Sequence, residues 1–174
     1  MDDLRVKKYL IAMGVPRSLW DWSIDDAPTH HKKVAIEIAD DIALFMKNGI
    51  RAEMKIEKDQ VLASRLAVFL LKCALREDYL NVAYITPVRL ATLMANSWEG
   101  SEEYTLLATK DMVVIDQISR DNFTDGTKVT AFTQLFTARY MNEKSTVYVI
   151  HDRVNFSEVL KNLLDSDKDI VRFK

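Results

Sequence analysis

The chain has 174 residues, 48% of them hydrophobic, and its 24 Lys and Arg against 26 Asp and Glu give a formal net charge of -2. This length suffices for one domain with a buried core and excludes a second full domain. The charge balance lacks the strongly basic character of a stand-alone nucleic-acid binder. The single cysteine, Cys73, excludes an intramolecular disulfide and favours a reducing compartment.

Residues 1–28 are predicted to form an N-terminal helix and the segment leading into a core of residues 29–174. The helix covers residues 2–13 and is stopped by Gly14 and Pro16. The chain shows no apolar signal core at its start and no apolar run near the roughly 20 residues that span a membrane. We therefore expect a cytoplasmic protein that does not bind membranes.

Helices and strands alternate along the core. Expected helices cover residues 29–48 (with Thr29 as N-cap), 59–76, 86–95 (with Thr86 as N-cap), 102–108, 128–141 and 155–164; expected strands cover residues 52–56, 81–85, 112–116, 146–150 and 169–173. Residues 96–103 and 121–126 are predicted loops. This alternation predicts a three-layer α/β fold, with a mainly parallel five-stranded sheet covered by helices on both faces. In such sheets, functional residues gather at the carboxyl ends of the strands.

The strand of residues 112–116 is apolar until it ends in Asp116. In P-loop NTPases, a carboxylate at this place holds the magnesium that bridges the terminal phosphates. Those enzymes also need a glycine-rich turn after the first strand, followed by Lys and then Ser or Thr. Residues 56–65 contain no glycine, and the acids Glu57 and Asp59 stand where phosphate would bind. The sequence therefore predicts neither a nucleotide cofactor nor a bound metal.

The histidines give no alternative catalytic site. His30 and His31 are adjacent, so on a helix they point in different directions and make a poor metal-binding pair. His151 follows the last long strand, but no serine or cysteine lies in a recognisable nucleophile motif. A hydrolytic triad is therefore not expected.

Most of the chain resembles the AAA+ helicase loaders of the DnaC/DnaI type and the related IstB-like transposition ATPases. The resemblance covers residues 14–173 and lies in Val15-Pro16-Arg17-Ser18-Leu19-Trp20-Asp21-Trp22, Leu66-Ala67-Val68-Phe69-Leu70-Leu71, Tyr84-Ile85-Thr86-Pro87-Val88-Arg89-Leu90, Asp111-Met112-Val113-Val114-Ile115-Asp116-Gln117-Ile118 and Phe136-Thr137-Ala138-Arg139-Tyr140. It implies an AAA+-like core, without a small lid domain, that works in DNA replication.

The departures from this family concern its nucleotide site. Leu62-Ala63-Ser64 stands where the family carries Gly-Lys-Thr, and Asp116-Gln117 replaces the Walker B pair of acids. Asp152 falls near the sensor position, and Asn162 aligns with the late arginine that reaches a neighbour's nucleotide. These residues are the degenerate positions of the site. They predict a pseudo-ATPase with no catalytic residues and no cofactor.

The combined reading is a non-hydrolysing DNA-replication accessory protein, of the kind a phage or mobile element carries. By resemblance, its partner would be a replicative helicase, a helicase loader or an active AAA+ ATPase in a mixed oligomer. Two alternatives stay open: a module that binds single-stranded DNA, and an ATPase with an unconventional site. The candidate partner contacts are Trp20, Trp22, Trp98 and Tyr104; Trp20 and Trp22 could instead fasten the N-terminal segment to the core.

Overall fold

The computed structural model describes residues 1–19, 21–56, 59–95, 100–120, 126–151 and 170–173. Its α-helices are α1 (Asp3–Ala12), α2 (Thr29–Asp40), α3 (Ile42–Lys47), α4 (Gln60–Arg76), α5 (Pro87–Ala95), α6 (Gly100–Thr109) and α7 (Gly126–Met141). Its strands are β1 (Arg51–Met54), β2 (Val82–Ile85), β3 (Met112–Ile118), β4 (Ser145–Ile150) and β5 (Ile170–Phe173), and two short 3-10 helices cover Arg17–Leu19 and Ile24–Asp26. The alternation expected from the sequence is thus present.

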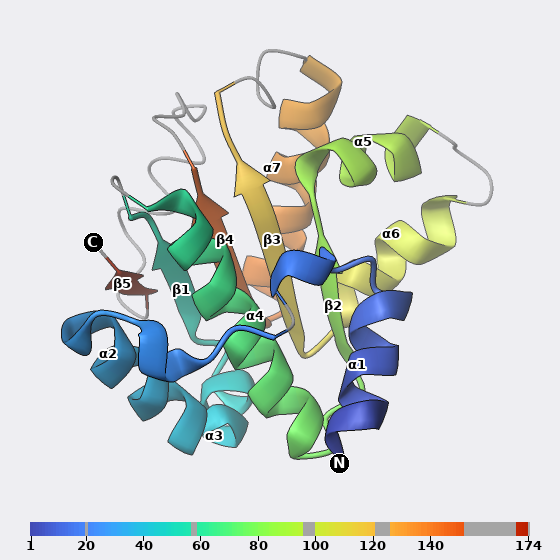
Figure 1. Cartoon of the computed structure of the whole chain (residues 1–174). Helices are drawn as coiled ribbons and strands as arrows, with labels where there is room; N and C mark the ends of the chain where they lie inside the picture. The colour runs from blue at the N-terminus through green and yellow to red at the C-terminus, as the bar shows by residue number, and fades with distance from the viewer. Residues whose placement is uncertain (20, 57–58, 96–99, 121–125, 152–169, 174) are drawn as a thin grey trace.

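The five strands form one sheet in the order β2-β3-β4-β1-β5, and every neighbouring pair is parallel. Helices α1 to α4 cover one face and α5 to α7 cover the other (Figure 1). Two hydrophobic clusters result, because alternate strand residues point to opposite faces. Val114 of β3 packs in the first cluster and Ile115 in the second. The three-layer α/β fold predicted from the sequence is confirmed.

Several element boundaries differ from the expectation. The helix expected over residues 29–48 is interrupted at Asp41, whose φ of -119° and ψ of 36° are not helical. The interruption lets α3 bury Phe45 and Met46 against the core. Pro28, not Thr29, is the N-cap residue of α2, and no side chain caps that helix. β3 continues past Asp116 to Ile118, and the helix expected over residues 155–164 lies outside the described residues.

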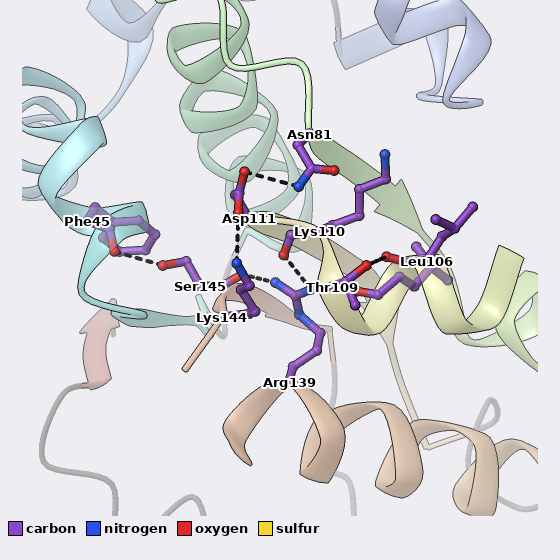
Figure 2. Close-up of polar contacts among 10 residues, drawn as sticks. Phe45, Asn81, Leu106, Thr109, Lys110, Asp111, Arg139, Lys144 and Ser145 are labelled. Carbon is purple, nitrogen blue, oxygen red and sulfur yellow. Dashed lines mark hydrogen bonds and ion pairs between the residues drawn. The ribbon is translucent and has the colours of Figure 1, made fainter. Parts of the chain in front are cut away.

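The amino ends of the strands are held together by a buried arginine (Figure 2). Arg139 of α7 is fully buried and donates to the Leu107 carbonyl at 2.5 Å, the Lys110 carbonyl at 2.9 Å, the Thr146 Oγ1 at 2.8 Å and the Ser145 carbonyl. Burial lowers the pKa of Arg139 to about 10, so the guanidinium stays charged at neutral pH. These bonds join α7 to the start of β4 and to the turn between α6 and β3.

Gly49, just past α3, is also fixed by its surroundings. Its φ is +61°, in the left-handed region that favours glycine, and a Cβ there would lie 2.3 Å from the carbonyl oxygen of Glu143. The close approach allows α3 to pack beside the turn before β4. Among the described residues, no helix is both long and apolar enough to cross a membrane.

Candidate functional site

Four polar side chains meet where the carboxyl ends of the central strands face the start of α4. They are Ser64 of α4, Tyr84 of β2, Asp116 of β3 and His151, which directly follows β4; we call them the polar cluster. The parallel register explains the meeting, since β2 and β4 both pair with β3. The cluster lies at the strand ends where the sequence pattern predicted functional residues.

Asp116 is the centre of the cluster and is only 1% exposed. The Ser64 hydroxyl donates to Asp116 Oδ1 at 2.8 Å, and the Tyr84 hydroxyl donates to Oδ2 at 2.5 Å. The Gln117 backbone N–H donates to Oδ1 at 2.7 Å, and His151 Nε2 lies 3.4 Å from the same oxygen. Four groups thus surround one buried carboxylate, so its charge is balanced by donors within the protein.

The hydrogen bonds decide the ionisation of the cluster. Burial by itself raises the pKa of Asp116, but the hydrogen bonds from His151, Tyr84, Ser64 and the Gln117 amide outweigh it, and the net pKa lies below the ordinary value. Burial, followed by the charge of Asp116, raises the pKa of Tyr84 above its usual range. Asp116 is therefore ionised and Tyr84 protonated near neutral pH.

Ser64, His151 and Asp116 do not form a hydrolytic triad. Ser64 Oγ lies 3.0 Å from His151 Nε2, and Asp116 Oδ1 approaches the same nitrogen. In a triad, the serine and the carboxylate bind different imidazole nitrogens. The Ser64 hydroxyl donates its hydrogen bond to Asp116 Oδ1, whereas the serine of a triad donates to the imidazole.

The turn between β1 and α4 uses its own carboxylate where a P-loop would bind phosphate. Asp59 is the N-cap of α4, and its Oδ1 accepts from the Leu62 N–H at 2.8 Å. The free N–H groups of a helix N-terminus normally form the anion site of a nucleotide-binding fold. Ile56, at the start of the turn, is buried, and its carbonyl accepts a hydrogen bond from the Asp59 N–H. The Leu62 N–H at the start of α4 is therefore satisfied by a side chain of the turn itself.

The sequence-predicted site residues divide into four groups. Leu62 and Ala63 are buried apolar residues of α4, and Ser64 and Asp116 belong to the polar cluster. Gln117 is exposed and adopts a φ of 62° at an irregularity in the pairing of β3 with β4. Asp152 and Asn162 lie outside the described residues. No group of three or more His, Cys, Asp or Glu suited to a metal occurs within the described ranges.

Sequence reasoning did not connect Tyr84 with Asp116. The available signal was position, because the strand over residues 81–85 and the strand before His151 both end beside Asp116 in a parallel sheet. Among the candidate partner contacts, Trp22 is half-buried and packs against the first hydrophobic cluster. Tyr104 is half-buried, with its hydroxyl donating to the Ala131 carbonyl at 3.2 Å. Trp20 and Trp98 lie outside the described residues, and contact with a partner stays a prediction for all four.

Comparison with solved structures finds replication initiators of the same fold. A DNA replication initiation factor and AMPPCP-bound DnaA from Aquifex aeolicus each match with a TM-score of 0.61 and 15% identity, over 88% of this chain and 50% of theirs. DnaA bound to AMPPCP and single-stranded DNA matches with a TM-score of 0.59 and 15% identity, over 90% of this chain and 49% of that one. The chain thus spans about half the length of these proteins. At this identity the likeness shows the fold alone, a parallel five-stranded sheet with helices on both faces.

Sequence comparisons give no family. No protein-family model matches the chain. A search of curated proteins also finds no match.

Proposed function

We propose that this chain is a non-hydrolysing accessory protein of DNA replication that acts by binding a partner protein. The observation that carries the proposal is Asp59, whose carboxylate caps α4 at the place where the fold would hold phosphate. A nucleotide triphosphate would have to displace this cap and then sit beside a carboxylate, and both steps are unfavourable. The similarity in fold to replication initiators supports the replication context.

The polar cluster adds a second argument for the loss of hydrolysis. Ser64 and Asp116 occupy the positions that would bind the magnesium of a nucleotide, but they are bonded to each other at 2.8 Å. Tyr84 and His151 engage the remaining Asp116 oxygen and the Ser64 hydroxyl. Gln117, an amide, follows Asp116 where a carboxylate would polarise the attacking water. The side chains of a hydrolytic site thus serve as internal structural bonds.

The partner class follows from the resemblance to helicase loaders. Proteins of that kind act in assemblies with a replicative helicase, so we propose as partner a replicative helicase, its loader, or an active AAA+ subunit beside which this chain sits. In such an assembly the partner would supply any nucleotide hydrolysis, because this chain supplies none.

Calorimetric titration with ATP and magnesium tests the absence of nucleotide binding. We expect no saturable heat up to about 1 mM ATP, which corresponds to a binding free energy weaker than about -4 kcal/mol. DnaA from Aquifex aeolicus, which has been solved with AMPPCP, is the positive control. Saturable binding by this chain that is lost in the Ser64→Ala variant would overturn the proposal.

Sedimentation of mixtures tests the partner. The purified chain is mixed separately with a replicative helicase and with a helicase loader, and we expect it to cosediment with one of them without nucleotide. A parallel arm uses labelled single-stranded DNA over a range of salt concentrations. Salt-dependent DNA binding with no association to either protein would favour the alternative of a DNA-binding module.

A further inference from the structure

The outer edge of β2 lies in a groove between two helices. β2 is the last strand on its side of the sheet, and within the described residues it pairs only with β3. An edge strand leaves every second N–H and C=O without a strand partner, so it can accept another strand. This edge groove has all four residues of β2 on its floor, Ala12 and Met13 at the end of α1 on one side, and α6 on the other.

The shape of the edge groove suits an extended peptide. Its volume is about 260 Å³, and its lining runs the whole length of β2. Four strand residues extend over about 13 Å, which is the length of a short added strand. Leu106 of α6 lines the groove and is 56% exposed, so an apolar side chain of an added strand would have a partner.

The charges at the two ends of the groove differ. Arg89 lies toward the carboxyl end of β2, where it is paired with Glu103 at 3.0 Å and donates to the Met13 carbonyl at 3.3 Å. Lys110 lies near the amino end of β2, because it precedes β3 and the two strands start side by side. In the part of the chain that the structure describes, no salt bridge involves Lys110. Lys110 lines the groove, so a carboxylate of a strand lying along β2 would meet this lysine near the amino end.

We propose that the edge groove binds an extended segment of a partner protein, which adds to the sheet beside β2 and places an acidic side chain on Lys110. Main-chain hydrogen bonds would supply affinity, and Leu106 and Lys110 would select the side chains. A second copy of this chain fits less well, because the edge is recessed between α1 and α6. Antiparallel pairing of two β2 strands would also place Lys110 of one copy toward Arg89 of the other, which is unfavourable.

Of the polar cluster, only Tyr84 lines this groove, so the inference goes beyond the proposed function and its test uses neither nucleotide nor helicase. The probe is a synthetic peptide with the sequence Glu-Val-Thr-Val-Thr-Val-Glu, blocked at both ends. One control replaces both Glu by Lys, and the other replaces the central Val by Pro, which cannot donate to a ladder. Binding is measured by fluorescence anisotropy, and amide hydrogen exchange locates the bound peptide on the full chain.

We expect the Glu peptide to bind about fivefold more tightly than the Lys peptide at low salt, and to slow exchange of the amides in Val82–Ile85. The Lys110→Glu variant should reverse this preference, whereas Lys47→Glu, an exposed lysine of α3, should leave it unchanged. Hydrogen exchange on the unmodified chain keeps the test valid if Lys110→Glu fails to fold. Equal binding of the Pro peptide, protection confined to other elements, self-association through β2, or no binding at about 1 mM peptide would each overturn the proposal.

Discussion

Replacing Arg139 by Met should be among the most destabilising single substitutions in the described structure. Met removes the donors that satisfy the carbonyls of Leu107 and Lys110. Figure 2 shows the Arg139 guanidinium and the Lys110 carbonyl facing each other. A buried acceptor left without a partner costs about 1–3 kcal/mol, so the two carbonyls together predict a loss of about 2–6 kcal/mol. A domain of this kind is stable by about 5–15 kcal/mol, so the loss is a large share of the total.

The assay is urea unfolding followed by tryptophan fluorescence, with the free energy of unfolding obtained by linear extrapolation. Arg139→Lys keeps the charge but cannot reproduce the planar fork, so it should fall between Met and the unmodified chain. Arg5→Met, at an exposed position of α1, is the matched control and should change stability by less than about 0.5 kcal/mol. An Arg139→Met variant within about 1 kcal/mol of the unmodified chain would refute the reasoning, because the carbonyls would then have another source of hydrogen bonds.

Three further predictions use the same unfolding assay. Thr133→Val should raise stability by about 1 kcal/mol, because within the described structure the buried Thr133 Oγ1 has no hydrogen-bond partner; an unchanged or lower value would contradict this. Gly49→Ala should lower the free energy of unfolding by about 1–3 kcal/mol, because of the positive φ and the contact of the new Cβ with the Glu143 carbonyl. Gly126→Ala, with open space around its Cβ, should be neutral or stabilising. Equal effects of the two substitutions would argue against the close approach at Gly49. Hydrogen bonding holds the pKa of Asp116 below 3.8 in the folded chain. The stability that ionised Asp116 contributes should therefore be complete well above pH 3.8 and lost as the pH falls through the lowered folded-state pKa. Asp116→Asn should flatten this acid dependence of the unfolding free energy, and an unchanged slope would refute the prediction.

The sequence predicted the fold where local pattern and burial agree. β3 and β4 are almost wholly buried, so their unbroken apolar runs identified them, and the alternation with helices implied parallel pairing. The interruption at Asp41 was missed because the surrounding residues keep a helical pattern. What separates α2 from α3 is the packing of Phe45 and Met46 on the core, which is a tertiary effect.

The site was predictable in position but not in detail. Asp116 was identified from its place at the end of the expected strand over residues 112–116, and Ser64 from the resemblance to the family's Gly-Lys-Thr. The structure brings the two to hydrogen-bonding distance. The roles of Tyr84 and His151 depend on which strands lie beside β3 and in what register, and a single sequence does not encode this locally. Arg139 was missed for a related reason, because an arginine near the end of a helix is usually exposed.

The sheet separates the core into two compartments, one beneath α1 to α4 and one beneath α5 to α7. Packing changes in the two compartments act on different neighbours, so their effects on stability should add. Substitutions can therefore accumulate beneath α5 to α7 while Ser64 and α4 keep their surroundings. Such independence would allow one half of the molecule to diversify in evolution while the other half conserves its architecture.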